Sequence, residues 1–140
     1  AVWSSFAVFA VGGLLGLFVD GGDARTPGHY HGVIGGVNLA FMGLFVVFVL
    51  PLLQRPPRRG RALSAMFWMY AIGQVLHGGG LFLAGGYGAP RKTAGADGLE
   101  ALGAQIGLYG MGVGAVVAVI GGIIFIVIVG RALLRPVGDA

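Results

Sequence analysis

Residues 101–134 read ALGAQIGLYGMGVGAVVAVIGGIIFIVIVGRALL, and no charged side chain precedes Arg131 in this stretch. A helix of about 20 apolar residues is long enough to cross the hydrocarbon core of a bilayer, which is about 30 Å thick. The stretch meets that length without a charge at its centre. It therefore predicts a transmembrane helix.

Three further stretches approach the same length and also lack charged residues at their centres. They cover about residues 1–19, 32–53 and 62–85. We therefore expect an all-α, polytopic membrane protein, with one membrane domain over residues 1–140 and four transmembrane helices. The first stretch begins without an initiating methionine, as expected if the N-terminal part is missing, processed or encoded elsewhere.

The composition agrees with this class of protein. Of the 140 residues, 56% are hydrophobic and 10% are charged, whereas a soluble domain has about 25% charged residues. The chain has no cysteine, which excludes disulfides, thiolate metal sites and cysteine nucleophiles. The net charge of +4 comes from basic residues between the apolar stretches, which indicates membrane flanks rather than nucleic-acid binding.

The loop charges predict an orientation. Arginines cluster at 55–61 and 131–135, whereas the charges of 20–25 and 91–100 roughly cancel. Loops rich in lysine and arginine stay in the cytoplasm. We therefore expect both termini in the cytoplasm and a multi-pass protein of a bacterial-type inner (plasma) membrane.

A polar cluster, TPGHYHG at residues 26–32, stands at the outer mouth of the second stretch. Pro27 suits the first turn of a helix, so we expect the helix to start close to His29. Positions two apart on a helix differ by about 200°, so His29 and His31 cannot easily hold the same ion. Each could instead bind a separate group, as axial imidazoles of two haems would. An interfacial pair that faces lipid headgroups explains an isolated HxH equally well.

A third histidine lies inside the third stretch. Tyr70, Gln74 and His77 share one helix face, and that face must point into the bundle rather than to lipid. We expect His77 to be a hydrogen-bonded structural residue rather than a ligand.

Two adjacent cations, Arg91 and Lys92, follow the third stretch on the same side as the histidine pair. Such cations could bind the propionates of a haem through charge-assisted hydrogen bonds, or they could be interfacial side chains that snorkel. Their position beside the histidine pair favours the propionates.

These motifs resemble those of the haem–copper oxidase (cytochrome c oxidase) subunit I family. His29-Tyr30-His31 is similar to the HxH that begins the tenth transmembrane helix of that subunit, and AGGYGAPRK at 84–92 is similar to the segment that ends the next helix. By this resemblance the four stretches correspond to the last four helices of a twelve-helix subunit, over essentially the whole chain.

The resemblance implies roles for individual residues. His29 would be the axial ligand of the high-spin haem at the oxygen-reducing site, and His31 one axial ligand of the low-spin haem. Arg91 and Lys92 would be the propionate-binding pair, although lysine replaces the second arginine and lacks its bidentate fork. The loop at 20–26 is shorter than is usual in the family, and Asp23 is the residue in it that could correspond to an outer magnesium ligand.

The resemblance also implies missing parts. The family's other low-spin haem ligand lies on its second helix and its copper ligands on its sixth and seventh, so copper is expected only from helices outside this chain. The chain is then a piece of a split or truncated subunit or a reduced paralogue, without catalytic residues of its own.

We therefore expect the C-terminal part of a subunit I-like protein, which supplies axial histidines to two haems in a respiratory-type electron-transfer complex. Its partners would be the remaining helices or other membrane subunits of that complex, together with the lipid bilayer. Two alternatives remain open: a non-catalytic structural membrane subunit that has lost haem, and a small haem b electron-transfer protein. In the second, His31 would pair with His77 or with a histidine of a partner chain.

Overall fold

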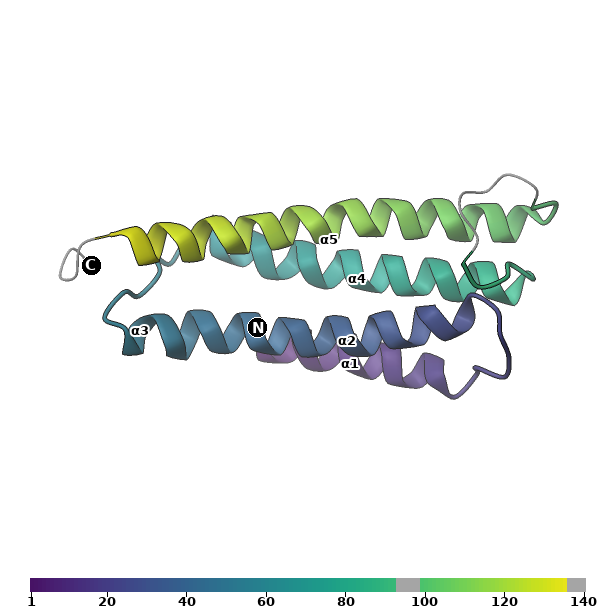
Figure 1. Cartoon of the computed structure of the whole chain (residues 1–140), viewed down its shortest axis with the longest axis horizontal. Coiled ribbons are helices and arrows are strands. Elements are labelled where there is room, and N and C mark those ends of the chain that lie inside the picture. The colour runs from purple at the N-terminus through teal and green to yellow at the C-terminus, as the bar shows by residue number, and fades with distance from the viewer. Residues whose placement is uncertain (93–98, 136–140) are drawn as a thin grey trace.

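The computed structural model describes residues 1–92 and 99–135, and this part of the chain is helical, as predicted. The helical elements are α1 (Val2–Gly16), α2 (Arg25–Leu44), the π-helical turn η1 (Phe45–Val49), α3 (Leu50–Leu52), α4 (Arg61–Gly86) and α5 (Leu102–Leu134). Helix α2, η1 and α3 follow one another as a continuous rod (Figure 1). The described residues contain no strand, only an isolated bridge between Asp23 and Pro90.

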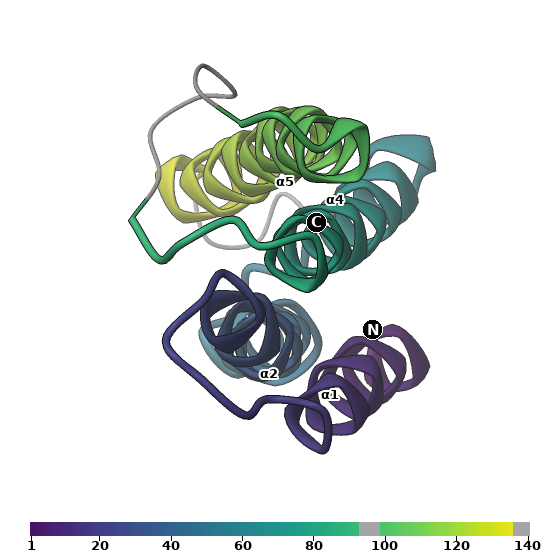
Figure 2. The ribbon, with the colours of Figure 1, turned by 90° about the vertical axis from the view of Figure 1, so that its right-hand side faces the viewer.

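The helices form two pairs that meet along α2 and α4. Helix α1 packs along α2, α5 packs along α4, and α2 packs against α4 (Figure 2). Side chains of α2, α4 and α5 together line a groove on one side of the molecule.

Glycines allow the backbones of these helices to touch. A Cβ atom at Gly12 of α1 would collide with the backbone of Gly32 and Val33 in α2, and one at Gly114 of α5 would collide with the backbone of His77 in α4. This close approach is the packing that four-residue glycine spacing favours in membrane helices. Gly110, four residues before Gly114, makes no such close contact: a Cβ added to it would have the Cα of Gly80 as its nearest neighbour, at 4.0 Å.

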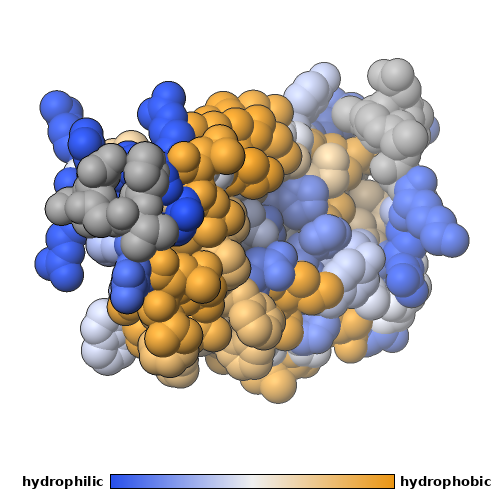
Figure 3. All heavy atoms as spheres, turned by 60° about the vertical axis from the view of Figure 1, so that its left-hand side comes forward, coloured by the Kyte–Doolittle hydropathy of each residue, from blue (hydrophilic) through white to orange (hydrophobic). Residues whose placement is uncertain are grey.

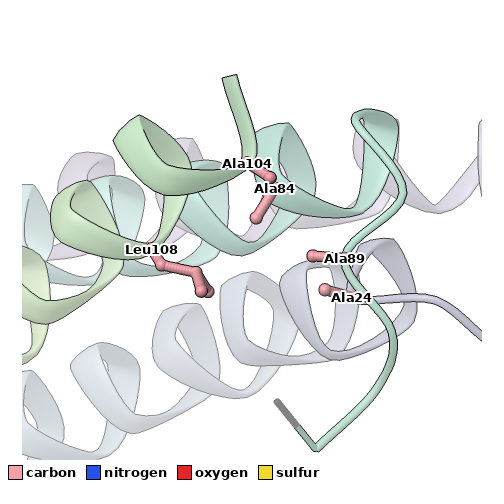
Figure 4. Close-up of a cluster of buried hydrophobic side chains, with 5 residues drawn as sticks. All are labelled: Ala24, Ala84, Ala89, Ala104 and Leu108. Carbon is pink, nitrogen blue, oxygen red and sulfur yellow. The ribbon is translucent and has the colours of Figure 1, made fainter. Parts of the chain in front are cut away.

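A cluster of small side chains closes one end of the bundle. It consists of Ala24, Ala84, Ala89, Ala104 and Leu108, all buried (Figure 4). The backbone N–H of Ala24 donates to the carbonyl of Ala89 at 3.0 Å. The loop before α2 and the loop after α4 are therefore joined at the end of the molecule where the sequence places its histidine pair and its cation pair.

Helix α2 begins at Arg25, one turn before the expected start near His29. The carboxylate of Asp23 accepts a hydrogen bond from the backbone N–H of Arg25 at 2.8 Å. Pro27 then falls in the first turn, where the missing N–H costs no helical hydrogen bond. Both His29 and His31 consequently lie within a formed helix.

Within the described residues, two helical segments are long and apolar enough to cross a membrane, rather than the four expected. They are Arg25–Leu52 and Leu102–Leu134, whose most apolar 18-residue stretches have mean hydropathies of 2.5 and 2.9. Helix α1 has 15 residues, about 22 Å at 1.5 Å per residue, which is less than the hydrocarbon core. The polar residues of α4 lower its hydropathy. Figure 3 shows hydrophobic side chains over much of the surface between hydrophilic clusters at the two ends.

Candidate functional site

His29 lies on the side of α2 that packs against α1. Its Nδ1 is 2.8 Å from the carbonyl oxygen of Gly12, and its ring lies over Gly16, where a Cβ would come within 2.6 Å of ring atoms. Because a carbonyl oxygen can only accept, Nδ1 carries the proton, and Nε2 of the neutral ring keeps a lone pair. Metal-ligating histidines are commonly oriented by such a bond from the other nitrogen.

His31 faces a different neighbour. The centroid of its ring is 4.6 Å from that of His77 in α4, and the two ring planes lie at 81°. The ring of Tyr30 is 5.1 Å away. The two histidines of the motif therefore contact different helices, as the angle of about 200° between their positions predicts.

His77 joins α4 to α5. Its Nδ1 is 3.1 Å from the carbonyl oxygen of Met111, so the hydrogen bond expected of a structural histidine is present. An imidazole nitrogen binds a metal at about 2.0–2.1 Å, so two imidazoles on opposite sides of one iron have ring centroids about 6 Å apart. The rings of His31 and His77 are closer than that, and in this arrangement they do not bracket one haem iron.

The groove widens into two hollows that share His31 and His77 as walls. The outer hollow has a volume of 280 Å³ and extends to Arg91 and Lys92, whose side chains are exposed. The structure thus brings His31 together with the predicted cation pair. His29 lines neither hollow, because it lies on the far side of α2.

The inner hollow, also 280 Å³, extends from His31 to Tyr70 and Gln74. Each hollow alone is just below the range of about 300–1,000 Å³ typical of ligand pockets, and the two together fall within it. The side chain of Asn38 donates to the Tyr70 hydroxyl at 3.1 Å nearby. No sequence motif marks Asn38, although its place seven residues after His31 puts both on one helix face.

Asp23, the candidate for an outer magnesium site, is already paired. Nη2 of Arg25 lies 2.7 Å from its Oδ2, and hydrogen bonding from this guanidinium lowers the pKa of Asp23 below its ordinary value. The same guanidinium also binds Asp20 and the carbonyl of Phe18. Within the described residues, no three histidine, aspartate or glutamate side chains gather as a metal would require.

The chain is 30% identical over 139 residues to an uncharacterized protein of Rickettsia prowazekii (strain Madrid E). The match covers 92% of this chain but 27% of the relative, so the chain spans about a quarter of the relative's length. No family model and no solved structure matches the chain.

Proposed function

We propose that this chain is the C-terminal, four-helix part of a haem–copper oxidase subunit I-like membrane protein, with His29 and His31 as axial ligands of a high-spin and a low-spin haem. The arginine-rich end of the molecule lies on the cytoplasmic side, and Ala1 lies part-way along the rod that begins with α2, beside Gly43. One observation carries the proposal: the two histidines of α2 face different helices, and the His31 side opens toward Arg91 and Lys92.

On the His31 side, the outer hollow offers the groups that a haem edge requires. The imidazole of His31 would supply a nitrogen ligand from the wall of the hollow, and two cations lie at its outer end. The guanidinium of Arg91 can bind a propionate with two parallel hydrogen bonds, whereas the ammonium of Lys92 acts as a point charge. A bound haem would supply the electron-transfer and oxygen chemistry, and the chain would hold and orient it.

On the His29 side, the chain provides an oriented imidazole. The bond from Nδ1 to the carbonyl of Gly12 holds the ring, as such bonds hold the histidine ligands of metals. The two histidines lie on one helix, about 3 Å apart along its axis. The helix would therefore set the distance and the relative orientation of the two haems.

The length of the Rickettsia relative supports a correspondence of this chain to one part of a longer protein. A four-helix unit matches 27% of that longer protein, and in the proposed family four of twelve helices would form the C-terminal part. The copper ligands and the second ligand of the low-spin haem would come from the remaining helices of the complex. The haem b alternative in which His31 and His77 bind the same iron is less favoured, because their ring centroids are 4.6 Å apart and an iron between them would need about 6 Å.

Optical and paramagnetic resonance spectra of the purified complex test the proposal. We expect one high-spin and one six-coordinate low-spin haem, with His29→Ala removing chiefly the first signal and His31→Ala the second. Tyr30→Phe, a change between them on the same helix, should leave both signals in place.

Three outcomes would contradict this assignment. A complex that contains no haem at full occupancy would indicate the structural subunit. A single bis-histidine haem would favour the haem b protein. Equal loss of one and the same haem in both histidine variants would show that the two-sided geometry is wrong.

A further inference from the structure

A third hollow lies at the opposite end of the molecule, between the loop before α4 and the last turns of α5. It has a volume of 210 Å³, and its walls include Arg58, Arg131 and Arg135. We call it the basic pocket. The loop joining α3 to α4 and the end of α5 meet at this end of the molecule (Figure 1).

The three arginines converge without a counter-charge among the described residues. Among the described residues there are two salt bridges, and both are made by Arg25 at the other end of the molecule. Like charges gathered at one place raise the electrostatic potential and favour a bound anion. The basic pocket therefore selects for a negatively charged ligand.

A neighbouring arginine holds one wall of the basic pocket in place. The guanidinium of Arg55 donates to the carbonyl oxygens of Leu133 and Arg135, the second at 2.6 Å. These bonds tie the end of α5 to the loop that carries Arg58. These two bonds thus hold the backbone at Arg135 against a loop that is far from it in the sequence.

The other wall of the basic pocket is apolar. Leu63, Ile128 and Ala132 line it, and Val127, the residue before Ile128 in α5, is 42% exposed. A free inorganic anion would leave this wall unused. An anion attached to acyl chains would place its charged group among the arginines and its apolar part along α5.

We propose that the basic pocket binds the phosphate group of an anionic phospholipid. Arginine forms paired hydrogen bonds with phosphate oxygens, and basic pockets between transmembrane helices on the cytoplasmic side bind lipid headgroups. The volume is below the range of about 300–1,000 Å³ typical of small-molecule sites, so it admits a headgroup rather than a whole lipid. The inference rests on the membrane placement proposed above, but not on the haems.

Native mass spectrometry of the purified, delipidated protein in uncharged detergent tests this inference. The protein is titrated separately with phosphatidylglycerol, phosphatidylcholine and inorganic phosphate. We expect the first phosphatidylglycerol to bind about tenfold more tightly than phosphatidylcholine, because arginines near a membrane surface attract anionic lipid. Added salt should reduce this preference, and inorganic phosphate should not displace the lipid at equal concentration.

Two double variants with the same loss of charge locate the site. Arg58→Gln with Arg131→Gln removes two of the charges that line the basic pocket. Arg59→Gln with Arg61→Gln removes the charges of two exposed neighbours that do not line it. We expect the first pair to abolish most of the preference for phosphatidylglycerol and the second to retain it. Circular dichroism confirms that each variant is folded. If the first pair fails to fold, the lipid preference of the unsubstituted protein and the salt dependence of that preference still test whether the protein recognises anionic lipid.

Three results would overturn the inference. Equal binding of the two lipids would exclude recognition of anionic lipid and make an acidic protein segment the candidate occupant. Equal losses in both double variants would indicate diffuse attraction at this end. Displacement of the lipid by equimolar inorganic phosphate would indicate a site for free anions. Haem spectra of the same preparation report on the proposed function independently.

Discussion

Two histidines in this chain make the same kind of hydrogen bond to a neighbouring helix. His29 and His77 each donate from Nδ1 to a backbone carbonyl of a neighbouring helix, Gly12 in one case and Met111 in the other. A carbonyl oxygen has two lone pairs, so it can accept this bond in addition to a helical one. Both bonds join helices, whereas His31 lines the two hollows on the other side of α2.

His77→Ala should lower the free energy of unfolding by about 1 kcal/mol, because the hydrogen bond between α4 and α5 is lost. His77→Asn should recover part of the loss, since its amide N–H can replace Nδ1–H. Denaturant unfolding followed by circular dichroism measures both changes. The haem spectrum should keep its intensity, and a lost Soret band in His77→Ala would show that this histidine is a ligand.

At the scale of elements, the long rod through α2 shows how local chemistry shapes a helix without ending it. Pro51 has no N–H to donate, and its ring crowds the carbonyl four residues earlier. The preceding turn, η1, widens to a π-helix, which is a common way to absorb such a disturbance within a helix. The rod thereby continues to Leu52 and reaches the length needed to cross a membrane.

The interface between α1 and α2 depends on glycines that lack a Cβ, and Gly12 is one of them. Gly12→Ala should destabilise the protein by about 1–3 kcal/mol, as overpacking does, because the new Cβ would strike the backbone of Gly32. Gly13→Ala is the matched control: a Cβ there meets nothing within 4 Å, and alanine favours a helix by about 1 kcal/mol. Thermal unfolding compares the two, and equal effects would contradict the observed register.

For the molecule as a whole, charge and polarity divide along the long axis. One end carries the histidine pair, Arg91 and Lys92, and the other carries the basic pocket. The apolar surface between them is what a bilayer would cover. The proposed orientation therefore makes a claim about which loop faces which compartment.

Single cysteines can test that claim, because the chain has none of its own. Gly22→Cys and Arg59→Cys both change exposed residues in loops at opposite ends. In spheroplasts, a membrane-impermeant maleimide should label Gly22→Cys at once and Arg59→Cys only after the membrane is permeabilised. The unsubstituted chain is the blank. Labelling of both from outside would show that the topology is wrong.

The helical content, and the residues on which the site is built, could be read largely from the sequence. The run lengths predicted helices close to those observed, and the two-residue spacing predicted opposite directions for His29 and His31. The start of α2 was misplaced by one turn, because the bond from Arg25 N–H to Asp23 is local side-chain chemistry that apolar run lengths do not report. The number of membrane-length helices was also overestimated, since α1 is short and α4 is polar on one face.

The sequence by itself determined that this chain is helical, apolar along its length and polar at a few positions, because hydropathy and helical period are properties of consecutive residues. Only the tertiary structure decided which of those positions meet: His31 with His77, Asn38 with Tyr70, and three arginines around one pocket. Such meetings depend on the rotation and partner of each helix. Those are set by close packing between residues far apart in the chain, which no local pattern contains.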